Sequence, residues 1–128
     1  MAMIHEFDPQ IYPRLLWVMI GGSEKDIIAQ FKNCDGTEFN LSDFNKANCA
    51  FCIHARQKST GLIGEFIWIT ERKYARGSTM AHEAAHAAMD ICYDLGIEID
   101  ALNQEPFAYL VGWIMKEINI AYKFKESK

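Results

Sequence analysis

The feature that most constrains the fold is a stripe of small and apolar side chains between residues 78 and 95. With 3.6 residues per turn, one helical side carries Ala81, Ala84, Ala85, Ala88, Cys92 and Leu95. Gly96 follows at the position expected for a C′ residue. Because alanine ends at Cβ, this stripe predicts a helix whose backbone lies close against a sheet.

The first part of the chain predicts a strand, a short helix and an irregular segment. Residues 11–20 are rich in β-branched and aromatic side chains. Since Pro13 has no N–H, this strand either begins near Arg14 or lies at an edge of the sheet. A Ser-x-x-Asp capping box predicts a helix over 24–32, and polar residues predict an irregular excursion over 33–48.

Two further strands are expected near residues 49–56 and 62–70. The short loop between them contains Gly61, which supplies a positive φ, so the pair reads as a hairpin. The second strand either offers a free edge that pairs with an extended peptide or is paired on both sides.

A second long helix is predicted over 104–122, and its apolar character on nearly all sides indicates burial. The resulting element order is β-α-β-β-α-α. We therefore expect one α+β domain over residues 1–128, with a small three-stranded sheet and the helices on one face.

Composition excludes several classes of protein. The chain has 128 residues, with 13 basic and 17 acidic side chains and a formal net charge of −4, which disfavours a nucleic-acid binder with a large basic face. No apolar run approaches the roughly 18 residues of a membrane span, and the first residues lack the features of a secretory signal. The expectation is a cytoplasmic protein without a membrane or nucleic-acid partner; its oligomeric state is not indicated.

The predicted alanine-rich helix also carries an H-E-x-x-H motif formed by His82, Glu83 and His86. Histidines at i and i+4 lie one above the other, so two imidazoles reach one metal ion. Glu83 is rotated away from the ligand direction, where it reaches metal-bound water without binding the metal. The alternative is a surface helix with two solvated histidines.

Glu105 is the candidate third ligand. It lies 19 residues after His86, in the first turn of the next predicted helix, where the helix dipole favours a carboxylate. Ala108 and Gly112 share its helical face and are small enough to allow close approach of the two helices. An ordinary first-turn acid is the alternative.

The motif and Glu105 resemble the zincin metallopeptidases, specifically the Glu-zincin (thermolysin-like) branch. The resemblance covers residues 62–122 and implies zinc bound by His82, His86 and Glu105, with Glu83 as general base. The opening Tyr-Pro-Arg-Leu-Leu-Trp and the Glu-Pro-Phe-Ala-Tyr-Leu-Val-Gly block also resemble short zincin-like proteins encoded in phages and prophages.

The same branch often places an Asp four residues after the second histidine, and Asp90 occupies that position. The resemblance implies that Asp90 orients a ligand imidazole. The alternative is that Asp90 is a solvated acid on the helix. Large Glu-zincins take a transition-state-binding His or Tyr from a second helical domain that this sequence does not show. We expect Tyr93 or Tyr109 to donate to the oxyanion, unless both are core or rim tyrosines.

The leading hypothesis is a minimal zinc metallopeptidase acting on a peptide or protein substrate. The alternative is a non-catalytic zinc-binding module of zincin fold, phage-derived, with a binding or structural role. Intact Glu83 favours catalysis, whereas the missing second domain favours the module.

The four cysteines are expected to be reduced and mostly buried. They are Cys34, Cys49, Cys52 and Cys92. A second metal site on Cys49 and Cys52, completed by His54 and Cys34, is disfavoured because a strand would direct the two thiols to opposite faces. His5 and His54 are interpreted as structural or surface residues.

Overall fold

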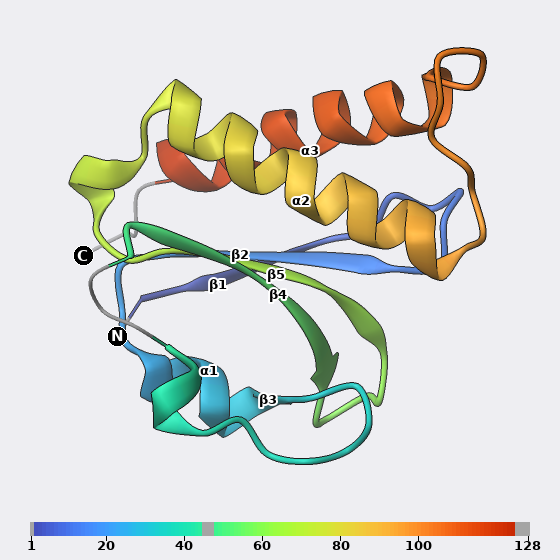
Figure 1. The fold of residues 1–128 in the computed structure, drawn as a ribbon. Coiled ribbons are helices and arrows are strands. Elements are labelled where there is room, and N and C mark those ends of the chain that lie inside the picture. Colours follow the sequence, from blue (N-terminus) through green and yellow to red (C-terminus); the bar gives the residue numbers. More distant parts are fainter. Residues whose placement is uncertain (1, 45–47, 125–128) are drawn as a thin grey trace.

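The computed structural model describes residues 2–44 and 48–124, which form an α+β fold (Figure 1). The elements in chain order are β1 (Ile4–Phe7), β2 (Leu15–Ile20), α1 (Glu24–Gln30), β3 (Phe31–Lys32), η1 (Leu41–Asp43), β4 (Ala50–Gln57), β5 (Ile63–Ile69), η2 (Arg72–Tyr74), α2 (Gly77–Asp94) and α3 (Glu105–Lys123). The two η elements are short 3₁₀ helices.

The strands form one mixed sheet in the order β1-β2-β5-β4-β3. Strands β2 and β5 run parallel, and the other neighbours are antiparallel. The predicted α+β class is confirmed, but the described residues form a five-stranded sheet and not the predicted three-stranded one. The missed strands have four and two residues, too short for alternation to identify them.

The predicted hairpin is confirmed as β4 and β5, with Gly61 at a φ of 75°. Strand β5 is paired by β2 on one side and β4 on the other, which excludes the free edge considered for residues 62–70. Strand β2 begins one residue after Arg14 and is likewise paired on both sides, so the edge position allowed by Pro13 is wrong.

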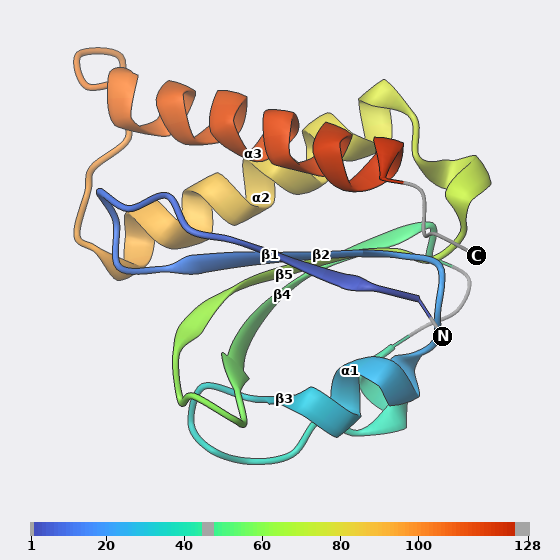
Figure 2. The same ribbon diagram turned by 180° about the vertical axis from the view of Figure 1, so that it is seen from behind.

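The helices lie on two sides of the sheet (Figures 1 and 2). Helices α2 and α3 cover one face, whereas α1 and the segment after β3 cover the other, so the prediction of helices on one face is wrong for α1. The reason is a second apolar core, in which Ile27 and Phe31 pack against Trp17 and Phe66. The helix predicted over 24–32 ends at Gln30 because Phe31 and Lys32 pair with β4.

Helix α2 ends as predicted. Gly96 has a φ of 69°, and the N–H of Ile97 donates to the carbonyl of Cys92 at 2.9 Å.

Helix α3 is not buried on all sides: Leu110 and Ile114 are fully buried, but Tyr109 is 48% exposed. Within the described residues no helix is both long enough and apolar enough to cross a membrane.

Candidate metal centre

The two histidines of the motif are exposed on α2, and their rings lie next to each other. Their Nε2 atoms are 3.1 Å apart, and the ring planes are inclined by 77°. Two imidazole nitrogens bound to one tetrahedral zinc at ordinary bond lengths lie about 3.3 Å apart. The positions of His82 and His86 therefore suit a shared metal ion.

Glu83 faces the sheet side of the same helix and is only 7% exposed. Burial raises the pKa of its carboxyl, and the nearby imidazoles of His82 and His86 oppose part of this increase. A carboxyl with a raised pKa exchanges a proton more readily near neutral pH than a solvated one does. Its environment is therefore suited to acid–base chemistry.

An open pocket of about 770 Å³ lies between α2 and the first half of β4. Residues from α2 that line it are Ser78, Thr79, His82, Glu83, His86 and Asp90, and those from the β4 side are Asn48, Cys49, Ala50, Phe51 and Cys52. The residues on the β4 side were not predicted to belong to the site. No local pattern in the sequence indicates that β4 lies beside the helix with the two histidines. Strand β4 reaches this position because it pairs with β5.

The free strand edge at this pocket belongs to β4. Strand β3 pairs only with Arg56 and Gln57, so residues 50–55 have no strand partner on that side within the described parts of the chain. Backbone N–H and C=O groups on such an edge can pair with an extended peptide.

Glu105 is exposed in the first turn of α3 and does not line this pocket. Among the described residues, it does not form a group of three donor atoms within 4.8 Å together with His82 and His86. A Cβ added at Gly112 would meet no atom within 4 Å, so helix approach does not require glycine there. The role of Glu105 as third ligand stays a prediction.

The predicted electrophiles both lie outside the pocket. Tyr93 is 86% exposed near the C-terminal end of α2, and Tyr109 is 48% exposed on α3. The amide and hydroxyl side chains that line the pocket are those of Asn48, Ser78 and Thr79. The tyrosine assignments therefore have no geometric support from the pocket.

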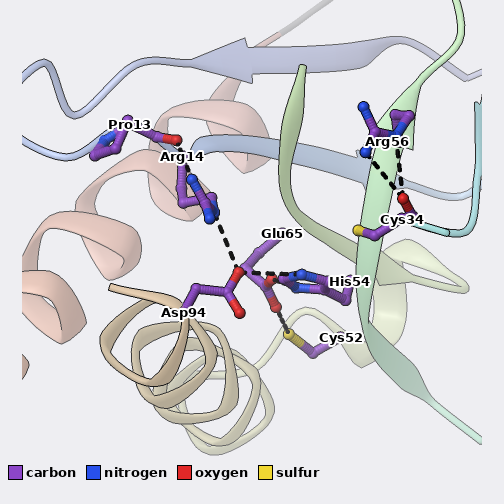
Figure 3. A network of polar contacts seen from close by, with 8 residues as sticks. All are labelled: Pro13, Arg14, Cys34, Cys52, His54, Arg56, Glu65 and Asp94. Atoms are coloured by element: carbon purple, nitrogen blue, oxygen red, sulfur yellow. Dashed lines mark hydrogen bonds and ion pairs between the residues drawn. The ribbon is translucent and has the colours of Figure 1, made fainter. Parts of the chain in front are cut away.

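A second group of polar side chains lies between α2 and the sheet (Figure 3). Glu65 of β5 is fully buried, and its Oε2 is 2.5 Å from Nδ1 of His54. Nε2 of His54 is 3.1 Å from Oδ2 of Asp94, which also accepts a 3.1 Å hydrogen bond from Arg14. The interpretation of His54 as a structural or surface residue missed this network. The available signal was Glu65, a charged residue within an otherwise apolar strand.

The protonation of this group follows from its contacts. Burial raises the pKa of Glu65 to about 8; the hydrogen bond with His54 opposes this effect, and one with Asp90 adds to it. The same hydrogen bond with Glu65 raises the pKa of His54. Asp90 thus contacts Glu65 and also lines the pocket between α2 and β4.

The cysteines are reduced in the structure, as predicted, but only Cys92 is buried. As whole residues, Cys34 and Cys52 are half-buried and Cys49 is exposed. Cys49 and Cys52 were expected on opposite faces of a strand, but both residues line the same pocket. The backbone carbonyl of Cys34 accepts two hydrogen bonds from the guanidinium of Arg56 (Figure 3).

Comparisons of the chain with protein-family models, with curated proteins and with solved structures found no match.

Proposed function

We propose that this chain is a zinc-dependent metallopeptidase of minimal zincin-like fold that hydrolyses peptide bonds. The observation that carries the proposal is the 3.1 Å separation of the two Nε2 atoms, with buried Glu83 next to them on α2. Two imidazoles and one carboxylate are a common ligand set of catalytic zinc.

In this proposal His82 and His86 hold the zinc, and Glu105 of α3 completes the set as the Glu-zincin resemblance implies. Bound zinc supplies Lewis acidity that lowers the pKa of water toward neutrality. Glu83 accepts the proton of the attacking water and returns it to the leaving amine. Its burial supports this role because a raised carboxyl pKa makes both transfers accessible near neutral pH.

The substrate is an extended peptide segment lying along the edge of β4. Unpaired backbone groups of residues 50–55 supply hydrogen bonds that are independent of side-chain identity. The residues Ala50, Phe51 and Cys52 line the same pocket as the histidines, so a peptide on this edge passes the metal centre.

The decisive experiment compares zinc content and cleavage of an unstructured peptide library for wild type, Glu83→Gln and His86→Ala. Glu83→Gln should keep zinc while turnover falls on the order of 10²–10⁴-fold, because the base is lost and the ligands remain. His86→Ala should lose both zinc and cleavage. Exposed Glu98→Gln is the matched control and should behave like wild type.

Cleavage by Glu83→Gln at the wild-type rate would exclude the peptidase and favour a non-catalytic zinc-binding module. One observation supports that second candidate: Tyr93 and Tyr109 both lie outside the pocket lining. A zinc-loaded wild type that cleaves no peptide of the library would point to the same conclusion.

A further inference from the structure

The buried carboxylate of Glu65 lies at the centre of two overlapping groups of metal-ligating atoms. One group comprises Cys52, Glu65 and Asp90, and the other comprises His54, Glu65 and Asp94; within each group, the donor atoms lie within 4.8 Å of one another. Strands β4 and β5 and helix α2 supply these side chains, so neither group is a local motif.

The two groups differ in which atoms are already engaged. Both ring nitrogens of His54 face carboxylates, Nδ1 facing Glu65 Oε2 and Nε2 facing Asp94 Oδ2. Asp94 is also held by Arg14. The second group is therefore a satisfied hydrogen-bonded network.

In the first group, the donor atoms face one another: the Cys52 thiol donates to Glu65 Oε1, and Asp90 is hydrogen-bonded to Glu65. Glu65 Oε1 points away from His54 and toward the Cys52 thiol, at an Sγ–Oε1 distance of 3.6 Å (Figure 3). A thiolate and a carboxylate oxygen bound to one tetrahedral zinc lie about 3.6 Å apart. Cys52 and Asp90 line the open pocket, which gives an ion a route to the buried Glu65.

We propose that Cys52, Glu65 and Asp90 form a second site for a thiophilic divalent cation such as Zn²⁺ or Co²⁺, on the sheet side of the pocket that contains the histidine pair. His54 is a supporting residue, because its hydrogen bond to Oε2 orients Glu65 and leaves Oε1 for the ion. This site does not depend on peptide hydrolysis or on zinc at the histidines.

Formal charges agree with a divalent occupant. With an ion bound, the Cys52 thiolate and the ionised carboxylates of Glu65, Asp90 and Asp94 would carry four negative charges. Arg14 and a His54 that donates from both nitrogens carry two positive charges. A divalent cation balances the remaining two, as a cluster with a fully buried carboxylate requires.

The test is a Co²⁺ titration of metal-free full-length protein under reducing conditions. The readouts are the thiolate-to-Co²⁺ charge-transfer absorption in the ultraviolet and the number of ions bound. Wild type should show this band. Cys52→Ser should lose the band and one bound ion, whereas Cys49→Ser, a change of the exposed thiol in the same pocket, should keep both.

Two further variants separate this site from its surroundings. The double variant His82→Ala/His86→Ala should keep the thiolate band, and this outcome holds even if the proposed peptidase function fails. His54→Gln should keep the band at saturation but weaken Co²⁺ binding roughly 10–100-fold, as loss of a supporting hydrogen bond does at other metal sites. Circular dichroism verifies that each variant is folded.

The proposal is overturned if wild type shows no thiolate band or if folded Cys52→Ser retains it. Loss of the band in Cys49→Ser would instead indicate a Cys49–Cys52 site. Loss in the double histidine variant would show that Cys52 binds the histidine-held ion. Both results contradict a separate site.

Discussion

Glu65 is a fully buried carboxyl on the central strand β5. Its hydrogen bonds with His54 and Asp90 join two strands and a helix. The side chain therefore links the protonation of the protein to the packing of α2 on the sheet.

We predict that the metal-free protein loses stability as pH rises from about 4.5 to about 8. The folded-state pKa of Glu65, about 8, lies above its ordinary value, so the folded state keeps a proton that the unfolded chain releases in this window. The raised pKa of His54 acts in the same direction. The free energy of unfolding should therefore fall with rising pH.

Denaturant unfolding in the presence of a chelator measures this dependence. Because the side chain of Glu65→Gln cannot ionise, the free energy of unfolding of this variant should fall less than that of wild type between pH about 4.5 and about 8. The difference should be at least about 1 kcal/mol. Glu98→Gln, at an exposed position, should retain the wild-type slope. Equal slopes in both variants would show that Glu65 does not hold the proton.

At the scale of elements, the contact between β2 and β5 leaves no space for a side chain at Gly64. A Cβ there would lie 2.1 Å from the carbonyl oxygen of Leu15 and 2.8 Å from the ring of Trp17. The parallel pairing of these strands joins the N-terminal part of the sheet to the β4–β5 hairpin. Glycine is thus required by tertiary contact and not by a positive φ.

Gly64→Ala should destabilise the protein by about 3 kcal/mol or more, since strand backbones must separate to admit the methyl group. Gly112→Ala is the matched comparison, because a Cβ on that helical position meets no atom within 4 Å. It should stabilise the protein by about 1 kcal/mol through higher helix propensity. Chemical denaturation of both variants checks the prediction; comparable stability of Gly64→Ala and wild type would contradict the described β2–β5 contact.

At the scale of the whole molecule, the proposed zinc centre would join residues of two helices. His82 and His86 lie on α2, whereas Glu105 lies in the first turn of α3 after a loop of ten residues. A metal ion bound by all three would tie the start of α3 to the middle of α2.

Zinc should therefore raise the melting temperature and slow amide hydrogen exchange in the first turn of α3. Glu105→Gln should lose the exchange protection in that turn and bind zinc more weakly, whereas Glu98→Gln should retain both properties. Hydrogen exchange followed by mass spectrometry, with and without zinc, measures the effect. Unchanged exchange near Glu105 in zinc-loaded wild type would exclude it as the third ligand.

Features that depend on local periodicity and turn chemistry could be predicted from the amino-acid sequence. The alanine stripe and Gly96 predicted α2 and its end, and Gly61 predicted the β4–β5 hairpin. The i, i+4 spacing of His82 and His86 predicted two neighbouring imidazoles, because helix geometry sets their separation without help from the rest of the chain.

Contacts between side chains far apart in the sequence could not be predicted in this way. Because β2 pairs with one side of β5, β4 lies on its other side, and the packing of α2 on β4 and β5 brings Asp90 to Glu65 and Asp94 to His54. Such contacts depend on strand order and on the choice of sheet face. Both are set by long-range burial of apolar surface, which no short stretch of sequence encodes.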